Sequence, residues 1–169
     1  EPLTISPLKE SNLSKPQKYF LEKGKIYLIK ENKPIKAYEI FHDQITHGYL
    51  GLCISKYDQE KLKQNHNISN TPIIWSSFKS SENAVSPKDL SGLISLISDF
   101  VNENENPILI LDCFDQIKFA NGFKRSYHLL LELKNITKVN NFIVLISISP
   151  NMFSNSQVSA IQDELEDII

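Results

Sequence analysis

The feature that most constrains the fold is an uninterrupted apolar run at residues 107–111, Pro-Ile-Leu-Ile-Leu, which Asp112 closes. Its large aliphatic side chains do not alternate with polar ones, a pattern typical of a strand that is covered on both faces. Strands of this kind lie at the centre of parallel sheets that carry helices on each side. The run therefore predicts an α/β domain with Asp112 at the carboxyl end of its central strand, the edge at which open α/β sheets bind ligands.

Four other apolar segments predict the remaining strands, and helical patterns separate them. The strands are expected at residues 26–29, 50–54, 72–75 and 142–146. The helices are expected at residues 34–47, 58–64, 86–101, 123–139 and 154–169, with Ser86 and Ser154 as N-caps. A loop that carries Asp115 and Lys118 is expected after the central strand. Because parallel strands joined by helices take right-handed crossovers, we predict a three-layer domain with a mainly parallel five-stranded sheet and helices on both faces.

The N-terminal residues differ in composition from the rest. Residues 1–23 carry three of the eight prolines and little apolar sequence, which indicates a linker or lead-in segment. Residues 24–169 are expected to form a single α/β domain, a size that buries roughly 70% of the unfolded-state surface. The sequence begins at Glu1 and its only methionine is Met152. We therefore expect the C-terminal part of a longer protein.

Charge and cysteine content indicate which partners and which cellular compartment to expect. The 18 Lys and Arg residues are interspersed with 20 Asp and Glu residues, so neither nucleic acid nor an anionic membrane surface is an expected partner. No apolar run approaches the ~20 residues of a membrane span, and no signal-peptide pattern opens the chain. Cys53 and Cys113 lie at the ends of predicted strands, where we expect buried thiols in a reducing compartment. The expected location is the cytoplasm, without membrane insertion.

The segment after the first predicted strand lacks a phosphate-binding loop. Such a loop needs glycines that let backbone N–H groups surround phosphate, together with a lysine and a hydroxyl. Residues 30–34, Lys-Glu-Asn-Lys-Pro, offer one suitably placed lysine, Lys33, and neither glycine nor hydroxyl. We therefore expect no cofactor and interpret Asp112 as a cap on the turn or helix that follows it. The alternative is a degenerate nucleotide-binding domain that uses Lys33, Asp112 and Asp115 around the strand ends.

The sequence contains no pattern for hydrolytic or metal chemistry. His42 and His47 are five residues apart on one predicted helix, the wrong spacing for metal ligation from a single helix face. The Gly-x-Ser-x-Gly turn that carries the nucleophile of many hydrolases is also absent. We therefore expect a protein that is not an enzyme and holds no metal.

The helix expected at residues 123–139 has a wide apolar surface. At 100° per residue, its apolar side chains spread over roughly 220°, whereas packing on a sheet requires a stripe of only ~100°. The final helix is one candidate for covering the excess. The other is a second copy of the chain or another protein, and two-fold pairing is the commonest arrangement. On this second interpretation, Leu129, Leu133 and Ile136 are expected in the interface.

Several short motifs resemble those of an archaeal family known as domain of unknown function 835. They are YLIKE at 27–31, Tyr38 with Phe41, HGYLGLCIS at 47–55, TPIIW at 71–75, PKDL at 87–90, Leu111-Asp112, NGF at 121–123 and the strand that Pro150 ends. The resemblance implies a RecA-like or KaiC-like fold that has lost its phosphate loop, often behind sensory domains such as PAS, and it implies no catalytic residue. It also places the central strand between the strands at 142–146 and 50–54.

Together, these observations predict a non-catalytic signalling or protein-interaction module of a multidomain archaeal protein, with a sensory domain upstream. The alternative stays a degenerate RecA-like nucleotide-binding domain with weak or no ATPase activity.

Overall fold

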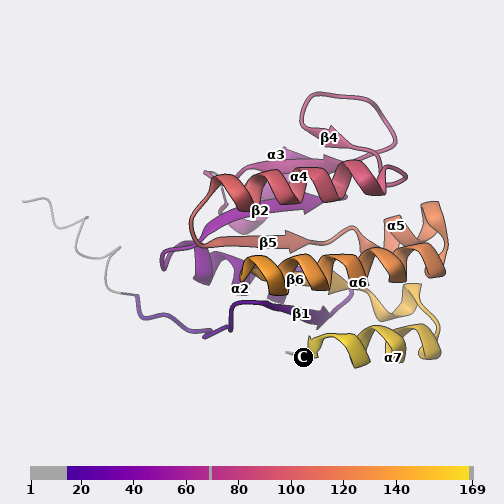
Figure 1. Ribbon diagram of the computed structural model, residues 1–169. Coiled ribbons are helices and arrows are strands. Elements are labelled where there is room, and N and C mark those ends of the chain that lie inside the picture. The colour runs from indigo at the N-terminus through magenta and orange to yellow at the C-terminus, as the bar shows by residue number, and fades with distance from the viewer. Residues whose placement is uncertain (1–14, 69, 168–169) are drawn as a thin grey trace, which may run out of the picture.

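The computed structural model describes residues 15–68 and 70–167, which form a parallel sheet with helices on both faces (Figure 1). The strands are β1 Lys25–Lys30, β2 Leu50–Ser55, β3 Ile73–Ser76, β4 Ala84–Val85, β5 Pro107–Leu111, β6 Ile143–Ile148 and β7 Glu166–Asp167. The helices are α2 Ile35–Ile45, α3 Gln59–His66, α4 Leu90–Glu103, α5 Phe114–Asn121, α6 Phe123–Asn140 and α7 Asn155–Glu164, with a 3-10 turn, η1, at Pro150–Met152.

All five predicted strands are present, and the sheet order is β4-β3-β2-β5-β6-β1-β7. The prediction that the 107–111 strand lies between its neighbours at 142–146 and 50–54 is confirmed, because β5 pairs with β6 and β2. Every residue of β5 is buried, as its two-sided apolar pattern requires. The predicted strand count of five was too low. Among the described residues the sheet has seven strands, because the two-residue strands β4 and β7 extend it at its edges.

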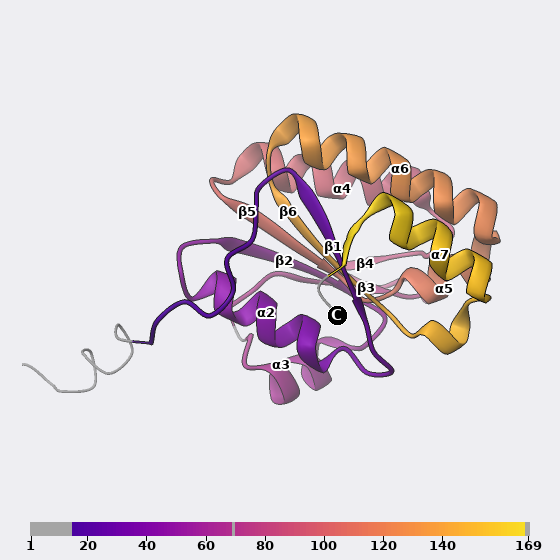
Figure 2. The same cartoon turned by 90° about the horizontal axis from the view of Figure 1, so that it is seen from below.

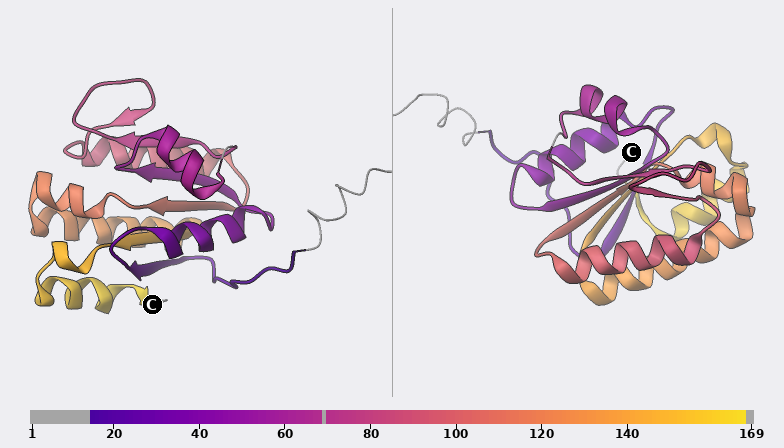
Figure 3. Two further views of the ribbon diagram at one scale, coloured as in Figure 1. Left: turned by 180° about the vertical axis from the view of Figure 1, so that it is seen from behind. Right: turned by 90° about the horizontal axis from the view of Figure 1, so that it is seen from above.

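The helices divide into two layers, which the views along the sheet separate clearly (Figures 2 and 3). Helices α2 and α3 cover one face, where Tyr38, Phe41 and Leu62 pack with Ile108 and Ile110 of β5. Helices α4, α5, α6 and α7 cover the other face in a larger apolar cluster. The three-layer α/β architecture predicted from the sequence is therefore confirmed.

The connections that leave β2 and β5 run to opposite faces of the sheet. The chain after β2 enters α3, whereas the chain after β5 enters α5 in the other layer. Because β2 and β5 are neighbours, their carboxyl ends form a topological switch point, the place at which open α/β sheets bind ligands. Asp112 and Lys56 both lie there, one residue beyond their strands.

One predicted loop forms a helix, and one helix begins at a later cap than predicted. The segment predicted as a loop after β5 forms α5, because Phe114 and Ile117 are buried in the core and hold it there. Helix α4 is capped by Asp89 rather than Ser86, since the Asp89 carboxylate accepts a hydrogen bond of 2.9 Å from the Gly92 backbone N–H. A Cβ at position 92 would meet the Asp89 carboxylate in its present position, so a larger residue there would require this carboxylate to shift.

The termini of the described chain are only partly as predicted. The predicted N-cap at Ser154 is confirmed and forms a capping box with Gln157, but α7 ends at Glu164 and residues 168–169 lie outside the described residues. Residues 15–23 of the predicted lead-in run along α2, and residues 1–14 lie outside the described residues. The Tyr19 backbone N–H donates to the Asp43 carboxylate over 2.8 Å. Within the described chain, none of the helices is long and apolar enough to cross a membrane.

The interface predicted on α6 is wrong for Leu129 and Leu133, because these two side chains belong to the core. Leu129 and Leu133 are buried, and Ile136 is half-buried against the same apolar cluster. The wide apolar surface of α6 is explained by its position, in which it contacts α4, α5, α7 and β1 (Figure 2). A protein partner or homodimer stays a prediction, but the buried side chains of Leu129 and Leu133 do not reach the surface to contact it.

Candidate functional site

Asp112 connects three segments at the switch point. Because Leu111 is in register with Ile54, Asp112 lies beside Ser55 at the end of β2. Its Oδ2 accepts hydrogen bonds from the Tyr38 hydroxyl, over 2.7 Å, and from the Ser55 hydroxyl, over 2.8 Å. Its Oδ1 accepts a hydrogen bond of 3.0 Å from the Lys56 backbone N–H. The Asp112 carboxylate therefore ties β5 to α2 and to the end of β2.

The prediction that Asp112 caps the turn or helix after it is wrong. Helix α5 begins after Cys113, whose side chain makes no capping hydrogen bond, and the partners of Asp112 all come from other parts of the chain. The carboxylate is only 3% exposed, so its oxygens have left water and need these donors. Asp112 therefore stabilises contacts between distant segments of the chain and does not cap α5.

Burial dominates the electrostatics around Asp112. It raises the pKa of the Asp112 carboxyl, while the hydrogen bonds from Tyr38, Ser55 and Lys56 oppose that rise. Burial also raises the pKa values of the Tyr38 phenol and the Cys53 thiol well above their ordinary values. The Tyr38 hydroxyl lies 3.1 Å from Cys53 Sγ. Phenol and thiol both stay protonated at neutral pH, so neither is prepared for nucleophilic chemistry.

Asp115 forms an ion pair with Lys56. Lys56 Nζ donates to Asp115 Oδ2 over 2.7 Å, and this joins α5 to the segment after β2. Burial alone would lower the pKa of the Lys56 ammonium, but the hydrogen bond and the charge of Asp115 outweigh it and raise the pKa. Lys56 therefore stays charged and is the cationic partner of Asp115.

The first turn of α2 is occupied by a carboxylate of the chain itself. Glu31 Oε1 accepts from the Lys36 backbone N–H over 2.8 Å, and Oε2 accepts from the Ala37 N–H over 2.9 Å. A helix that follows the first strand of an α/β sheet offers free N–H groups of this kind to a bound phosphate. In this protein, Glu31 fills that position and complements the partial positive charge of the helix end.

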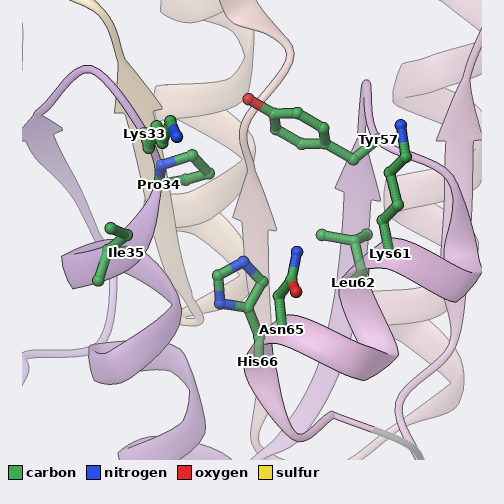
Figure 4. A pocket seen from close by; sticks show the side chains of 8 residues that line it. All are labelled: Lys33, Pro34, Ile35, Tyr57, Lys61, Leu62, Asn65 and His66. Atoms are coloured by element: carbon green, nitrogen blue, oxygen red, sulfur yellow. The ribbon is translucent and has the colours of Figure 1, made fainter.

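A pocket of about 490 Å³ lies between the start of α2 and helix α3 (Figure 4). Its lining consists of Lys33, Pro34, Ile35, Tyr57, Lys61, Leu62, Asn65 and His66. The His66 ring stacks on the Tyr38 ring, with centroids 4.2 Å apart and planes 13° apart. Since the Tyr38 hydroxyl donates to Asp112, this pocket adjoins the Asp112 hydrogen-bond network.

The structure gives different surroundings to the three residues that the sequence grouped as nucleotide ligands. Asp112 and Asp115 have partners within the protein, whereas Lys33 lines the pocket between α2 and α3. Among the described residues, no group of three or more His, Cys, Asp and Glu side chains is arranged to hold a metal ion.

Sequence reasoning missed Tyr38, Ser55, Lys56 and the capping role of Glu31. The rule that directed attention to Asp112 could have found Ser55 and Lys56, because they end or follow the strand beside β5. Tyr38 comes from the middle of a helix, so no strand-end signal marks it.

A model of a known protein family matches most of the chain. The family model described as "Protein of unknown function (DUF835)" matches residues 29–165, a range that includes Glu31, Asp112 and the whole pocket lining. A search of curated proteins finds no match.

Proposed function

The chain belongs to the DUF835 family, and we propose that it is a non-catalytic module that binds other proteins in a signalling chain. In this proposal, it passes the state of a sensory domain in the same polypeptide to a protein partner or to a second copy of itself. A cytoplasmic location fits the two cysteines, Cys53 and Cys113, which are buried and unpaired.

The observation that carries the proposal is the position of the Glu31 carboxylate at the N-terminus of α2. A nucleotide phosphate at this helix end would have to displace Glu31 from the Lys36 and Ala37 N–H groups. The carboxylates at the switch point are also engaged, Asp112 with three donors and Asp115 with Lys56. These contacts favour a structural use of the groups that an ATPase would need for magnesium and phosphate.

A surface suited to a protein partner lies where α5 and η1 meet. The Phe119 side chain is 83% exposed and Met152 is 52% exposed, although large apolar side chains are usually buried. Lys118 Nζ donates to the Met152 carbonyl over 2.6 Å and thereby holds the two segments together. Exposed aromatic and methionine side chains are enriched in protein interfaces, which supports a partner at this place.

The proposal predicts that nucleotides do not bind. We expect no change in melting temperature when the protein is heated with magnesium and ATP or GTP, with a P-loop ATPase as the positive control. A ligand at 100 times its dissociation constant would stabilise the fold by about 2.7 kcal/mol, which thermal melting detects easily. A saturable, magnesium-dependent increase would contradict the proposal and favour the degenerate nucleotide-binding domain.

A second prediction concerns the partner surface. With the photo-crosslinking residue p-benzoylphenylalanine at position 119 of the full-length protein, we expect a discrete protein adduct in the cells that make it. The matched control has the same residue at the exposed Lys124 on α6, where we expect no adduct. The mass of the adduct distinguishes a second copy from another protein. Equal labelling at both positions, or none at 119, would argue against this surface.

A further inference from the structure

The pocket between α2 and α3 is built from two segments that are well separated in the sequence. Pro34 and Ile35 come from the start of α2, while Tyr57 and Leu62 come from the loop after β2 and from α3. Figure 4 shows the Tyr57 ring reaching across toward Pro34, above Leu62 and His66. The volume of about 490 Å³ falls within the ~300–1,000 Å³ of sites that hold small molecules. Its walls are mainly apolar, so they suit an apolar ligand body.

The charged groups of the pocket are all cationic. Lys33 and Lys61 line it from opposite sides, and none of the described lining residues is acidic. Neither lysine ammonium forms an ion pair with another residue in the described part of the chain. Two unpaired cations at the rim of an apolar pocket attract an anionic group and leave the apolar part of the same ligand for the walls.

The polar groups of α3 add hydrogen-bonding capacity at the inner side of the pocket. Burial lowers the pKa of His66, so its imidazole is neutral at neutral pH and can both donate and accept a hydrogen bond. The position of this ring is fixed by its stacking on Tyr38. The Asn65 amide lies beside it in Figure 4. A ligand in the pocket would therefore meet a rigid ring and an amide next to the apolar walls.

We propose that this pocket binds a compact amphipathic molecule, with an aromatic or branched apolar body and one anionic group, either a carboxylate or a phosphate monoester. Lys33 and Lys61 hold the anionic group, and Pro34, Ile35, Tyr57 and Leu62 contact the apolar body. The pocket has no carboxylate to hold magnesium, so it does not suit a magnesium-bound triphosphate. This proposal goes beyond the protein-interaction role and concerns a different surface from Phe119 and Met152.

The test is a titration of the ¹⁵N-labelled protein, followed by nuclear magnetic resonance, with three probes of similar shape. Phenylacetate and phenyl phosphate carry the anionic group, and phenylacetamide is the neutral control. We expect saturable shifts in the backbone amides of Ile35, Lys61 and His66 with at least one anion, and about 10-fold weaker binding of the amide probe. The anion that binds with the lower dissociation constant identifies the preferred anionic group.

Substitutions then test the cations directly. Lys33→Ala and Lys61→Ala should each weaken binding of the preferred anion by about 5- to 10-fold, since each removes one charge-assisted contact. Lys124→Ala removes an exposed lysine from α6, on the opposite face of the sheet, and should leave the affinity unchanged. No saturable shift at the pocket, equal affinity for the neutral probe, or unchanged affinity in both lysine variants would overturn the proposal. Because the amides report the place of binding, these results are independent of the nucleotide and crosslinking experiments.

Discussion

Replacing Asp112 by leucine is expected to lower the free energy of unfolding by about 3 kcal/mol or more, because several buried donors lose their acceptor. The Tyr38 hydroxyl, the Ser55 hydroxyl and the Lys56 N–H all donate to this carboxylate. Each donor that stays buried without a partner costs about 1–3 kcal/mol, although the Tyr38 hydroxyl can turn toward Cys53 Sγ. Urea unfolding followed by circular dichroism measures the difference.

Asparagine at position 112 is the matched control, because its shape is nearly that of aspartate. Its amide oxygen can accept from the Lys56 N–H, and its NH₂ group can donate to the two hydroxyl oxygens, so we expect a change within about 1 kcal/mol. Comparable losses for leucine and asparagine would mean that the negative charge, rather than hydrogen-bond acceptance, holds the three segments together. That result would contradict the assignment of this role to the hydrogen bonds of Asp112.

The comparison of the unsubstituted protein with Asp112→Asn also predicts how the free energy of unfolding changes with pH. Burial raises the pKa of Asp112, so between the unfolded-state value of about 3.9 and the folded-state value the native protein holds a proton that the unfolded chain releases. This stabilisation is fully present below the unfolded pKa and is lost as the pH rises through the folded pKa. The stability of the unsubstituted protein relative to Asp112→Asn should therefore fall as the pH rises through this window.

Replacing Leu133 by alanine is expected to lower the free energy of unfolding by about 2–5 kcal/mol, the usual cost of truncating a leucine in a packed core. Leu133 is 2% exposed and lies in the apolar cluster that α6 shares with the sheet and the neighbouring helices. The loss should appear in urea unfolding at any protein concentration, since the cavity forms within one molecule.

Leu131 on the same helix is the matched control, because it is 37% exposed and lies outside that cluster. Leu131→Ala should change the free energy of unfolding by less than about 1 kcal/mol. A core role also requires that Leu133→Ala leave the molar mass in light scattering unchanged under folded conditions. If Leu133→Ala dissociated a dimer without loss of stability, the assignment of this side of α6 to the core would be wrong.

The fold could be predicted from the sequence where a pattern had a single physical explanation. The run at 107–111 has no polar alternation, so it could only be covered on both faces, and it is the buried central strand β5. The two-residue strands β4 and β7 are too short for any periodicity. The sequence predicts a loop in place of helix α5, because only Phe114 and Ile117 mark its buried side among apolar positions.

The apolar surface of α6 and the candidate site show the limit of one-dimensional patterns. The pattern correctly indicated that α6 needs cover beyond the sheet, and the final helix, α7, was one predicted cover, but the pattern did not identify α4 and α5. Strand-end reasoning located Asp112, whereas its partner Tyr38 is 74 positions away in a helix. Contacts of this kind depend on how a helix is placed over the sheet, which no local signal contains.

The two short edge strands limit the ways in which the domain can associate. Unpaired strand edges are the usual template for adding a strand from another chain, and proteins avoid unwanted pairing by keeping their edge strands short. In the described structure, each edge of the sheet ends in a strand of only two residues, β4 on one side and β7 on the other. These two edge strands therefore offer few backbone N–H and C=O groups with which an extended peptide or another sheet could pair. The short edges therefore favour partners that recognise side chains on helices and loops over partners that add a strand to the sheet.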